Sequence, residues 1–582
     1  MPSPTFLNVE NSATGRRWIG PSLDAERLGL AISQATGFPP VLGQILANRG
    51  VQPEDATAYL TPSLRELMPD PSSLRDMDKA TERFLQAVDQ NQRIAIFADY
   101  DVDGGSSAAL LIVWLRERGI SATLYIPDRI DEGYGPNNEA MEMLGRDHDL
   151  IITVDCGTLS HEPVAAAGID VIVLDHHLGG ETLPPAVAVV NPNRQDETGD
   201  LSYLCAAAVV FLMLASANRS LRNRGETGPD LVAMLDLVAL ATVADVAPLI
   251  GFNRALVRQG LTVMANRARV GLVALSDIAR MNSAPSSYHL GYLLGPRINA
   301  GGRVGAADLG ARLLATNDPS EAEALAERLD ALNTERRDIE ATVLAQATQQ
   351  AEERGVTGGL VWAAADGWHP GVVGIVASRL KEAFNRPAVV IGIDGQEGKG
   401  SGRSVNGVDL GNAISTCTRE GLLLKGGGHK MAAGLTVSTD MLDAAMARLT
   451  ELLEKQGSAN AGPADLRIDG LISPTGATVD LIEKLEQAGP FGASSPAPRF
   501  ALASTRISFA KRAGDSHLRL TLTNGSGGKI DAIAFRAFES DLGPMLENHN
   551  GQAFHFAGRL EVDDWGGRRK AKLKLEDAAK AS

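Results

Sequence analysis

One stretch of nine residues, Asp99-Tyr100-Asp101-Val102-Asp103-Gly104-Gly105-Ser106-Ser107, most constrains how this chain can fold. An apolar run over residues 94–98 leads into it and predicts a buried β-strand. An apolar-periodic segment over residues 107–118 follows it and predicts a helix with Ser106 as its cap. Three carboxylates are therefore expected at the carboxyl end of a strand, where open α/β sheets bind ligands. Because carboxylates this close repel one another, the cluster predicts a site for a hard divalent cation.

The same D-x-D-x-D-G pattern opens the calcium loop of an EF-hand, and two features argue against that alternative. An EF-hand needs a bidentate Glu at loop position 12, which here is Leu110, and it needs a helix before the loop, where this chain has a strand. The other alternative is a solvated acidic turn that binds no metal. The ligand-type residues farther along the chain make it the weaker interpretation.

Strand and helix patterns alternate along the chain after the aspartate cluster. Strands are expected over residues 93–98, 122–126, 150–154, 171–174 and 186–190. This alternation predicts βαβ units and a mainly parallel sheet. Two of the later strands also end in ligand-type residues, Asp155-Cys156-Gly157 and Asp175-His176-His177. Since the carboxyl ends of parallel strands meet at one edge, these residues can converge with the aspartate cluster, and Asp245 follows a helical stretch over residues 231–243.

The predicted metal ligands combine five carboxylates with one imidazole. They are Asp99, Asp101, Asp103, Asp155, His176 and Asp245. Aspartates alone suit Mg²⁺ or Ca²⁺, and the added histidine favours Mn²⁺ or another transition metal. So many acids indicate two ions, about 4 Å apart, as in enzymes that hydrolyse phosphoesters.

A chain of 582 residues is too long for one core and predicts several domains. The expected domains are an N-terminal helical module (1–79), an α/β domain (80–317), a connecting helix (318–355), a smaller α/β domain (356–458) and a small β-barrel (463–578). Glycine-rich turns are expected at residues 398–402 and 426–428. Three cysteines without a C-x-x-C pair argue against disulfides and structural zinc. With no membrane-spanning run and no secretory signal pattern, a cytoplasmic protein is expected.

Charge is distributed unevenly along the chain. The net charge of −16 argues by itself against nucleic acid as a partner. Residues 499–574, however, contain 13 Lys/Arg and 8 Asp/Glu, a balance of +5, with aromatic residues interleaved. Basic residues with stacking rings are typical of an OB-fold that holds single strands. Most of the phenylalanines are expected in the barrel core, and Trp565 is the better stacking candidate.

At these residues the chain resembles the DHH phosphoesterase family, which takes its name from a motif present here as Asp175-His176-His177. The resemblance extends to residues 99–104, 155–157 and 242–246, and to Gly426-Gly427-Gly428-His429 in the associated DHHA1 domain. The chain is most similar to the family's single-strand-specific 5′→3′ DNA exonucleases. The long form of that branch has an N-terminal module, a connecting helix and a C-terminal OB-fold.

The resemblance implies a role for each of the matching residues. The catalytic residues would be Asp101, Asp103, Asp155, His176, His177 and Asp245, and Asp99 would join them as a metal ligand. Asp155 would bridge two ions, Mn²⁺ or Mg²⁺, and His177 would face the scissile phosphate. The substrate-binding residues would be Arg129, Tyr134, Arg297, Asn299, Arg303, His369, Ser401, Arg403 and His429. Of these, Arg129, Ser401 and Arg403 would hold a 5′-terminal phosphate.

The implied function is metal-dependent 5′→3′ degradation of single-stranded DNA to 5′-mononucleotides, in DNA repair and recombination. A single-strand-binding protein and a helicase would be partners, no membrane is involved, and a monomer is expected. Two alternatives remain open. One is a family oligoribonuclease or nucleotide phosphatase that acts on short RNA or dinucleotides, although those relatives lack the extra C-terminal domain. The other is a non-catalytic single-strand-binding scaffold, which would have no reason to keep mutually repelling carboxylates.

Overall fold

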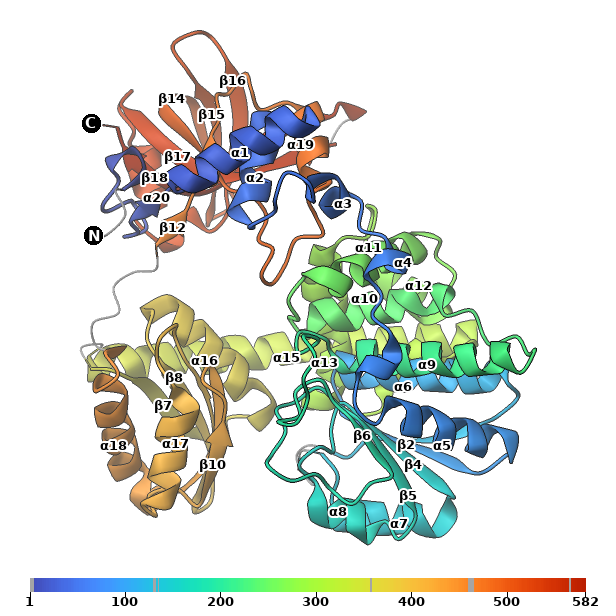
Figure 1. Cartoon of the computed structure of the whole chain (residues 1–582). Helices are drawn as coiled ribbons and strands as arrows, with labels where there is room; N and C mark the ends of the chain where they lie inside the picture. Colours follow the sequence, from blue (N-terminus) through green and yellow to red (C-terminus); the bar gives the residue numbers. More distant parts are fainter. Residues whose placement is uncertain are drawn as a thin grey trace. The chain divides into compact units, whose positions relative to one another are not determined.

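The computed structural model describes residues 5–128, 132–133, 135–355, 358–458, 465–564 and 567–581. The chain divides into two compact units, one formed by residues 1–66 together with 462–582 and the other by residues 67–461 (Figure 1). Among the described residues, no helix is long and apolar enough to cross a lipid bilayer.

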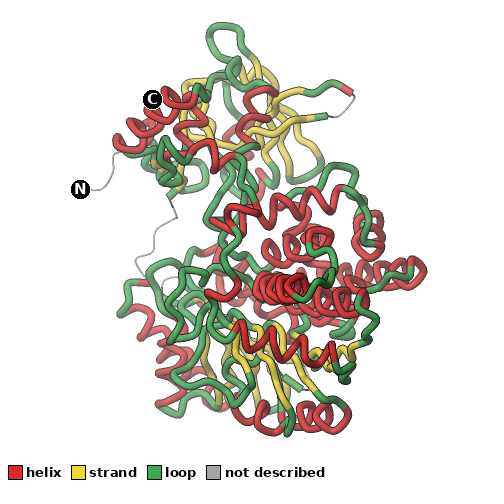
Figure 2. Tube along the Cα trace, turned by 45° about the vertical axis from the view of Figure 1, so that its right-hand side comes forward, coloured by secondary structure: helices red, strands yellow, loops and turns green. Residues whose placement is uncertain are grey.

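The first lobe of the larger unit is built on a five-stranded parallel sheet, as the strand and helix pattern predicts. The strand order is β3-β2-β4-β5-β6, and every neighbouring pair runs parallel. The strands are β2 (Ile94–Ala98), β3 (Ala122–Tyr125), β4 (Leu150–Val154), β5 (Asp170–Leu174) and β6 (Ala188–Val190). Helices cover both faces (Figures 1 and 2). They are α7 (Asn138–Asp147) and α8 (His161–Ala166) on one face, and α5 (Met77–Asp89), α6 (Val102–Glu117) and α9 (Ala206–Asn223) on the other.

The helix after the aspartate cluster begins earlier than the sequence predicts, and Asp101 rather than Ser106 is its N-cap. The Asp101 carboxylate accepts hydrogen bonds from the backbone N–H groups of Asp103 (2.9 Å) and Gly104 (3.1 Å). Gly104 makes this early start possible, because a Cβ there would lie 2.3 Å from the carbonyl oxygen of Asp99. The prediction of Ser106 as the cap was wrong, and Ser106 is fully buried inside the helix.

The rest of the first lobe is helical and leads into the connecting helix. It contains α10 (Leu235–Ala244), α11 (Gly251–Ala265), α12 (Val270–Ile278), a π-helical turn η4 (His289–Leu294), α13 (Gly295–Val304) and α14 (Leu309–Ala315). The predicted connecting helix is confirmed as α15 (Pro319–Arg354). Its first half buries Leu329 against α13, and its second half buries Val343 and Ala347 in the core of the second lobe.

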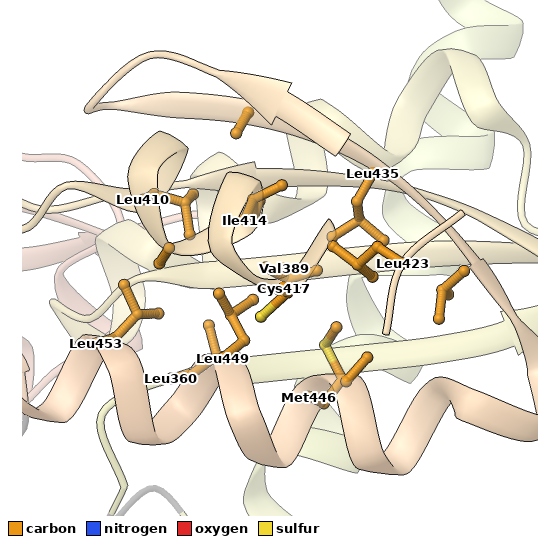
Figure 3. Packing of buried hydrophobic residues seen from close by; sticks show 14 of the residues in the cluster. Leu360, Val389, Leu410, Ile414, Cys417, Leu423, Leu435, Met446, Leu449 and Leu453 are labelled. Carbon is orange, nitrogen blue, oxygen red and sulfur yellow. The ribbon is translucent and has the colours of Figure 1, made fainter. Parts of the chain in front are cut away.

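The second lobe has a mixed five-stranded sheet with the order β10-β11-β9-β8-β7. Its elements are β7 (Val361–Asp366), α16 (Pro370–Phe384), β8 (Ala388–Asp394), β9 (Glu397–Arg403), α17 (Leu410–Arg419), β10 (Lys425–Gly428), β11 (Ala432–Ser438) and α18 (Leu442–Glu454). Figure 3 shows Leu410 and Ile414 of α17 and Leu449 of α18 packed together over the sheet.

Two segments predicted as glycine-rich turns are strands. Residues 398–402 lie in β9 and residues 426–428 in β10. Glycine is needed in β9 because neighbouring side chains fill the space that its own would occupy. A Cβ at Gly400, for example, would lie 2.8 Å from Ile391 Cγ1 and 3.0 Å from Leu435 Cδ1.

The smaller unit contains the expected β-barrel. Strands β14 (Phe500–Ala513), β15 (His517–Thr523), β16 (Lys529–Ala534), β18 (Lys570–Lys580) and β17 (Ala553–Asp563) follow one another, and pairing of β17 with β14 closes the circle. Phe554 and Phe556 lie in the barrel core, as expected, whereas Phe509 and Phe535 are exposed. Trp565, the predicted stacking residue, lies outside the described residues.

The first 66 residues share their core with this barrel. Strand β1 (Trp18–Ile19) pairs in parallel with β12 (Leu466–Arg467), and the Trp18 indole N–H donates to Asp577 over 2.9 Å. Helices α1 (Leu23–Thr36) and α2 (Pro40–Asn48) bury residues beside Phe500. The remaining elements of this unit are η1 (Phe6–Asn8), α3 (Ala56–Leu60), α4 (Leu64–Leu67), β13 (Gly470–Leu471), α19 (Val479–Glu486), η7 (Ala537–Glu539) and α20 (Leu542–Glu547).

Candidate metal centre

Ligand-type side chains converge at the carboxyl edge of the first sheet. They form three groups, and within each group one ligand atom per residue lies within 4.8 Å of the others. The groups are Asp99–Asp101–Asp155, Asp103–His176–Asp245 and Asp155–His176–His177. All six residues that the sequence predicts as metal ligands are therefore brought together, although they come from four separate parts of the chain.

His176 lies among the carboxylates. Its Nε2 atom is 3.2 Å from Asp155 Oδ1 and 3.6 Å from Asp103 Oδ2. Its Nδ1 atom is 3.9 Å from Asp245 Oδ2, at the end of α10. One imidazole thus faces three carboxylates, which is a donor set suited to a divalent metal.

Asp155 owes its position to the sharp turn that follows β4. Its backbone N–H donates to the Leu174 carbonyl (2.9 Å), and its φ of +61° is left-handed, a conformation that aspartate tolerates better than most residues. The turn continues through Gly157, where a Cβ would lie 2.6 Å from Thr153 Oγ1. This conformation holds the buried carboxylate at the edge of the sheet, beside the aspartate cluster.

Asp103 is fixed by the first turn of α9. Its two carboxylate oxygens accept hydrogen bonds from the backbone N–H groups of Ala206 (2.7 Å) and Ala207 (2.8 Å). Helix N-termini favour negative charge, so α9 holds this carboxylate in one orientation.

Asp175 positions the two histidines. It accepts hydrogen bonds from the backbone N–H groups of His176 (2.7 Å), His177 (3.1 Å) and Thr158 (3.0 Å), and from His177 Nδ1 (2.8 Å). Burial alone would raise the pKa of Asp175, but these hydrogen bonds and the His177 charge lower it. Burial in turn would lower the pKa of His177, yet the bond to Asp175 and the nearby carboxylates raise it to about 9. Asp175 is therefore a partner of His177 and orients its ring.

The carboxylates of the centre are buried and repel one another, and a bound cation would offset both effects. Burial, followed by the charges of Asp103 and Asp101, raises the pKa of Asp155 well above its usual range. The same causes raise the pKa of Asp245 to about 8. A divalent ion replaces the missing solvation and offsets the repulsion between these groups. Buried oxygen donors with added imidazole fit Mn²⁺ or Mg²⁺.

Two asparagines that the sequence analysis did not single out support the histidines. Asn191 Nδ2 donates to Thr158 Oγ1 and to the His177 carbonyl, both over 2.8 Å. Asn193 Nδ2 donates to the His176 carbonyl over 2.6 Å. The signal that could have found them is Asn191-Pro192-Asn193 itself, because these polar residues end β6 as the other ligand-type residues end β2, β4 and β5.

Two of the predicted substrate residues in the first lobe contact the aspartate cluster (residues 99–103) or the second lobe. Asn299 Oδ1 accepts a hydrogen bond from the Val102 N–H (2.9 Å), next to the aspartate cluster. Arg303 donates to the Gly371 carbonyl (3.1 Å). Arg297 instead forms an ion pair with Asp330 of α15 (2.8 Å).

The predicted residues of the second lobe lie at the end of β9, at the start of α16 and in the turn between β10 and β11. Arg403 donates to Ser401 Oγ over 3.0 Å at the end of β9. His369 Nδ1 accepts from the Gly371 N–H (3.0 Å), so His369 caps α16. His429 is exposed in the turn between β10 and β11. Arg129 and Tyr134 lie outside the described residues.

The sequence matches three domain families. Residues 93–242 match the DHH family N-terminal domain, residues 357–455 the DHHA1 domain and residues 468–577 the RecJ OB domain.

The chain is also similar to curated relatives along most of its length. It is 38% identical over 567 residues to the single-stranded-DNA-specific exonuclease RecJ of Dickeya dadantii, which covers 93% of this chain and 96% of that protein. It is 35% identical over 563 residues to the protein of the same name from Escherichia coli, again with 93% and 96% covered. Among solved structures, RecJ from Thermus thermophilus with Mn²⁺ superimposes with a TM-score of 0.81 at 28% identity, covering 97% of this chain and 80% of that chain. The same protein with Mg²⁺ gives a TM-score of 0.76.

Proposed function

Because this chain belongs to the RecJ family of single-stranded-DNA-specific exonucleases, we propose that it releases 5′-mononucleotides from the 5′ end of single-stranded DNA, in DNA repair and recombination. Its activity depends on divalent metal, Mn²⁺ or Mg²⁺. The observation that carries the proposal is the convergence of Asp103, Asp155 and His176 at the edge of a parallel sheet.

The metal would be held by Asp99, Asp101, Asp103, Asp155, His176 and Asp245. Asp155 and His176 each belong to two of the three ligand groups, and only the carboxylate has two oxygens to offer, which supports Asp155 as the residue that would contact both ions. Metal ions held by these residues would supply activation of the attacking water and stabilisation of the charge that develops on the phosphate. The chain's own contribution is to hold these carboxylates in place and to exclude bulk water from them.

His177 would face the scissile phosphate. Its Nδ1 is hydrogen-bonded to Asp175, and in the metal-free chain this bond and the nearby carboxylates raise the pKa of the ring, which favours its protonated form. The second ring nitrogen can then donate a hydrogen bond to a phosphate oxygen. Asp175 fixes the direction of that donor.

Ser401 and Arg403 would hold the 5′-terminal phosphate, together with Arg129. A guanidinium and a hydroxyl 3.0 Å apart form a pair of donors matched to phosphate oxygens. Helix α16 leaves room beside them through Gly374, where a Cβ would lie 3.1 Å from Ser401 Oγ and 3.2 Å from Arg403. The further substrate contacts proposed are Tyr134, Arg297, Asn299, Arg303, His369 and His429.

The barrel would hold the single strand farther from the 5′ end. Lys511 of β14 lies directly opposite Arg519 of β15, and both are exposed. Like charges in this arrangement destabilise a sheet unless an anion lies between them. Phe509, on the same outward face as Lys511, offers a ring for base stacking. These three residues support a strand-binding face on the barrel.

The domain limits, the partners and the oligomeric state are also proposals. The segments that match known domains, 93–242, 357–455 and 468–577, fall inside the proposed domains 80–317, 356–458 and 463–578. A monomer that works with a single-strand-binding protein and a helicase remains the prediction.

Digestion of matched oligomers tests the function. The chain is incubated with Mn²⁺ or Mg²⁺ and 5′-phosphorylated single-stranded DNA, duplex DNA and RNA, labelled at the 3′ end, and product lengths are resolved over time. We expect the labelled single-stranded DNA to shorten one nucleotide at a time while the duplex stays intact. Hydrolysis of short RNA or dinucleotides alone would favour the oligoribonuclease or phosphatase alternative. Binding without hydrolysis would favour the scaffold.

A further inference from the structure

Two exposed tyrosines stack on each other in the first lobe. The ring centroids of Tyr288 and Tyr292 are 5.4 Å apart and the ring planes differ by 23°. The two residues are 62% and 75% exposed. Large aromatic side chains bury much apolar area when they can, so an exposed stacked pair indicates a surface that binds something flat and apolar.

The backbone beneath the pair is a π-helical turn, a feature that is rare and often found at functional sites. Leu290 and Leu294 of this turn are fully buried and anchor it. The His289 ring accepts a hydrogen bond from the Ser286 backbone N–H (3.1 Å). The tyrosines therefore project from a fixed support, and little entropy is lost when a ligand stacks on them.

The pair also adjoins the elements that form the metal centre. A Cβ at Gly291, between the two tyrosines, would lie 3.3 Å from Val243, two residues before the metal ligand Asp245. One turn later, a Cβ at Gly295 would lie 3.4 Å from Ala244 and 3.9 Å from Val102 of the aspartate loop. The backbone of the turn that carries the rings thus packs against the end of α10 and reaches the start of α6.

The helix continues from the tyrosines to the predicted substrate residues. The π-helical turn runs without a break into α13, which carries Asn299 and Arg303 four residues apart, one α-helical turn. Asn299 contacts the aspartate cluster and Arg303 contacts the second lobe. At 1.5 Å per residue, Tyr292 lies about 16 Å along the axis from Arg303, the length of a few nucleotides.

We propose that Tyr288 and Tyr292 form a stacking platform for bases of the single strand a few nucleotides from the scissile phosphate. The inference rests on the proposed function and adds a specificity determinant to it. Every base has an aromatic face, so such a platform holds any sequence. In a duplex, those faces are covered by neighbouring base pairs, so the platform selects unpaired DNA.

The test compares Tyr288→Ala/Tyr292→Ala with the matched control Tyr288→Phe/Tyr292→Phe, which keeps both rings. Hydrolysis of a 5′-phosphorylated 12-mer and of a trimer is measured with Mn²⁺, together with binding of a labelled 12-mer by fluorescence anisotropy. We expect the alanine variant to bind the 12-mer about tenfold more weakly, to raise its KM to the same extent and to cleave the trimer like the parent. The phenylalanine variant should match the parent. A 12-mer with abasic nucleotides at the third to sixth positions should weaken binding to the parent but not further weaken binding to the alanine variant.

Each other outcome has its own meaning. Hydrolysis of both oligomers with unchanged KM in the alanine variant would overturn the platform and leave the proposed function intact. Tyrosine-dependent binding of the 12-mer without hydrolysis by the parent would overturn the proposed function and support the platform. Equal losses in the alanine and phenylalanine variants would show that the hydroxyl groups act, and would overturn stacking.

Discussion

The metal centre and the outer face of the barrel both bring like charges together, one in the interior and the other at the surface. At the metal centre, Asp103 and Asp155 are 1% and 2% exposed. On the barrel, Lys511 and Arg519 lie opposite each other on the neighbouring strands β14 and β15, and both are exposed to solvent. Water screens the second pair but is excluded from the first, so the same kind of repulsion has very different strengths.

This difference in burial suits the first region to metal-dependent catalysis and the second to binding of an anionic strand. Buried carboxylates with strongly raised pKa values need a cation, and the ion that satisfies them can act on a phosphate. Exposed basic residues gain only modest energy from an anion, so they contribute affinity that depends on salt.

The barrel also shows why a charge count overstates its basic surface. The excess of positive charge over residues 499–574 is partly neutralised by ion pairs in the folded unit. Arg499 pairs with Glu576 (2.6 Å) and Arg512 with Glu547 (2.6 Å). Arg512 is neutralised by Glu547, whereas its neighbour Lys511 lies opposite another positive charge. Substitutions at the two positions therefore compare a basic residue in an ion pair with one that lies opposite a like charge, as contacts for a DNA strand.

The largest effect is expected from removing a ligand of the metal centre. Asp155→Ala and His176→Ala should each lower hydrolysis of single-stranded DNA by at least about a hundredfold, because a ligand shared by two groups is lost. The variants should stay folded, since removing Asp155 also removes repulsion. Initial rates with Mn²⁺ restored after chelation are the measurement, with the exposed Asp147→Ala as control. Rates within threefold of the parent would contradict the assignment.

Arg403 is half-buried, so its exposure lies between that of the buried metal ligands and that of the exposed basic residues of the barrel. Arg403→Ala should raise KM about tenfold for a 5′-phosphorylated oligomer and change it little for the 5′-hydroxyl form, since a guanidinium–phosphate contact is lost. Kinetics on both oligomers measure this. An equal loss on the two substrates would make Arg403 a general backbone contact.

Burial predicts an unusual pH dependence for the metal-free chain. Asp245 has a pKa of about 8 in the folded state against an ordinary 3.8, so between these values the folded state holds a proton that the unfolded state has released. Stability should therefore fall as pH rises from 5 to 8, by about 5 °C or more in Tm. Mn²⁺ should restore it, most strongly at pH 8. Calorimetric scans measure this, and Asp245→Asn should make the profile less steep, while Asp155, whose pKa is also raised, still contributes. A level or rising metal-free Tm would contradict the account.

The smallest effect is expected on the barrel. Lys511→Ala/Arg519→Ala should weaken binding of a long single strand a few-fold and lower the slope of log affinity against log salt by about 1.4. Arg512→Ala should do less, because Glu547 already neutralises that charge. Anisotropy titrations across a salt series measure this. If Arg512→Ala matches or exceeds the double variant, the strand lies elsewhere on the barrel.

Point variants are preferable to deletion of the C-terminal domain. Cutting the chain near residue 460 would remove β12 and the barrel residues on which residues 1–66 pack, and would expose Trp18 and its neighbours. A loss of binding in such a truncation would mix the role of the barrel with partial unfolding.

Strand ends could be predicted from the sequence because apolar runs followed by Asp or His are local patterns. They located β2, β4 and β5 and, through them, every predicted ligand except Asp245, which follows helix α10. The cap at Asp101 was missed because it depends on how closely Gly104 approaches the Asp99 carbonyl, which is a three-dimensional relation. Asn191 and Asn193 were missed because they act on backbone carbonyls rather than on the metal.

The pairing of residues 1–66 with the barrel could not be read from the sequence either. Trp18 and Asp577 are 559 positions apart, and nothing in their local patterns links them. The same holds for β9, whose glycines resemble a turn until Ile391 and Leu435 fill the space above them.

The decisive measurement for the two-ion centre is a crystal structure of the chain soaked in Mn²⁺, with the manganese located by its anomalous signal. We expect two anomalous peaks at the carboxyl edge of the first sheet, both within about 2.3 Å of an Asp155 oxygen and one of them bonded to His176. The Asp155→Ala variant should lose at least one peak. Peaks elsewhere, or full occupancy of both sites in that variant, would contradict the account.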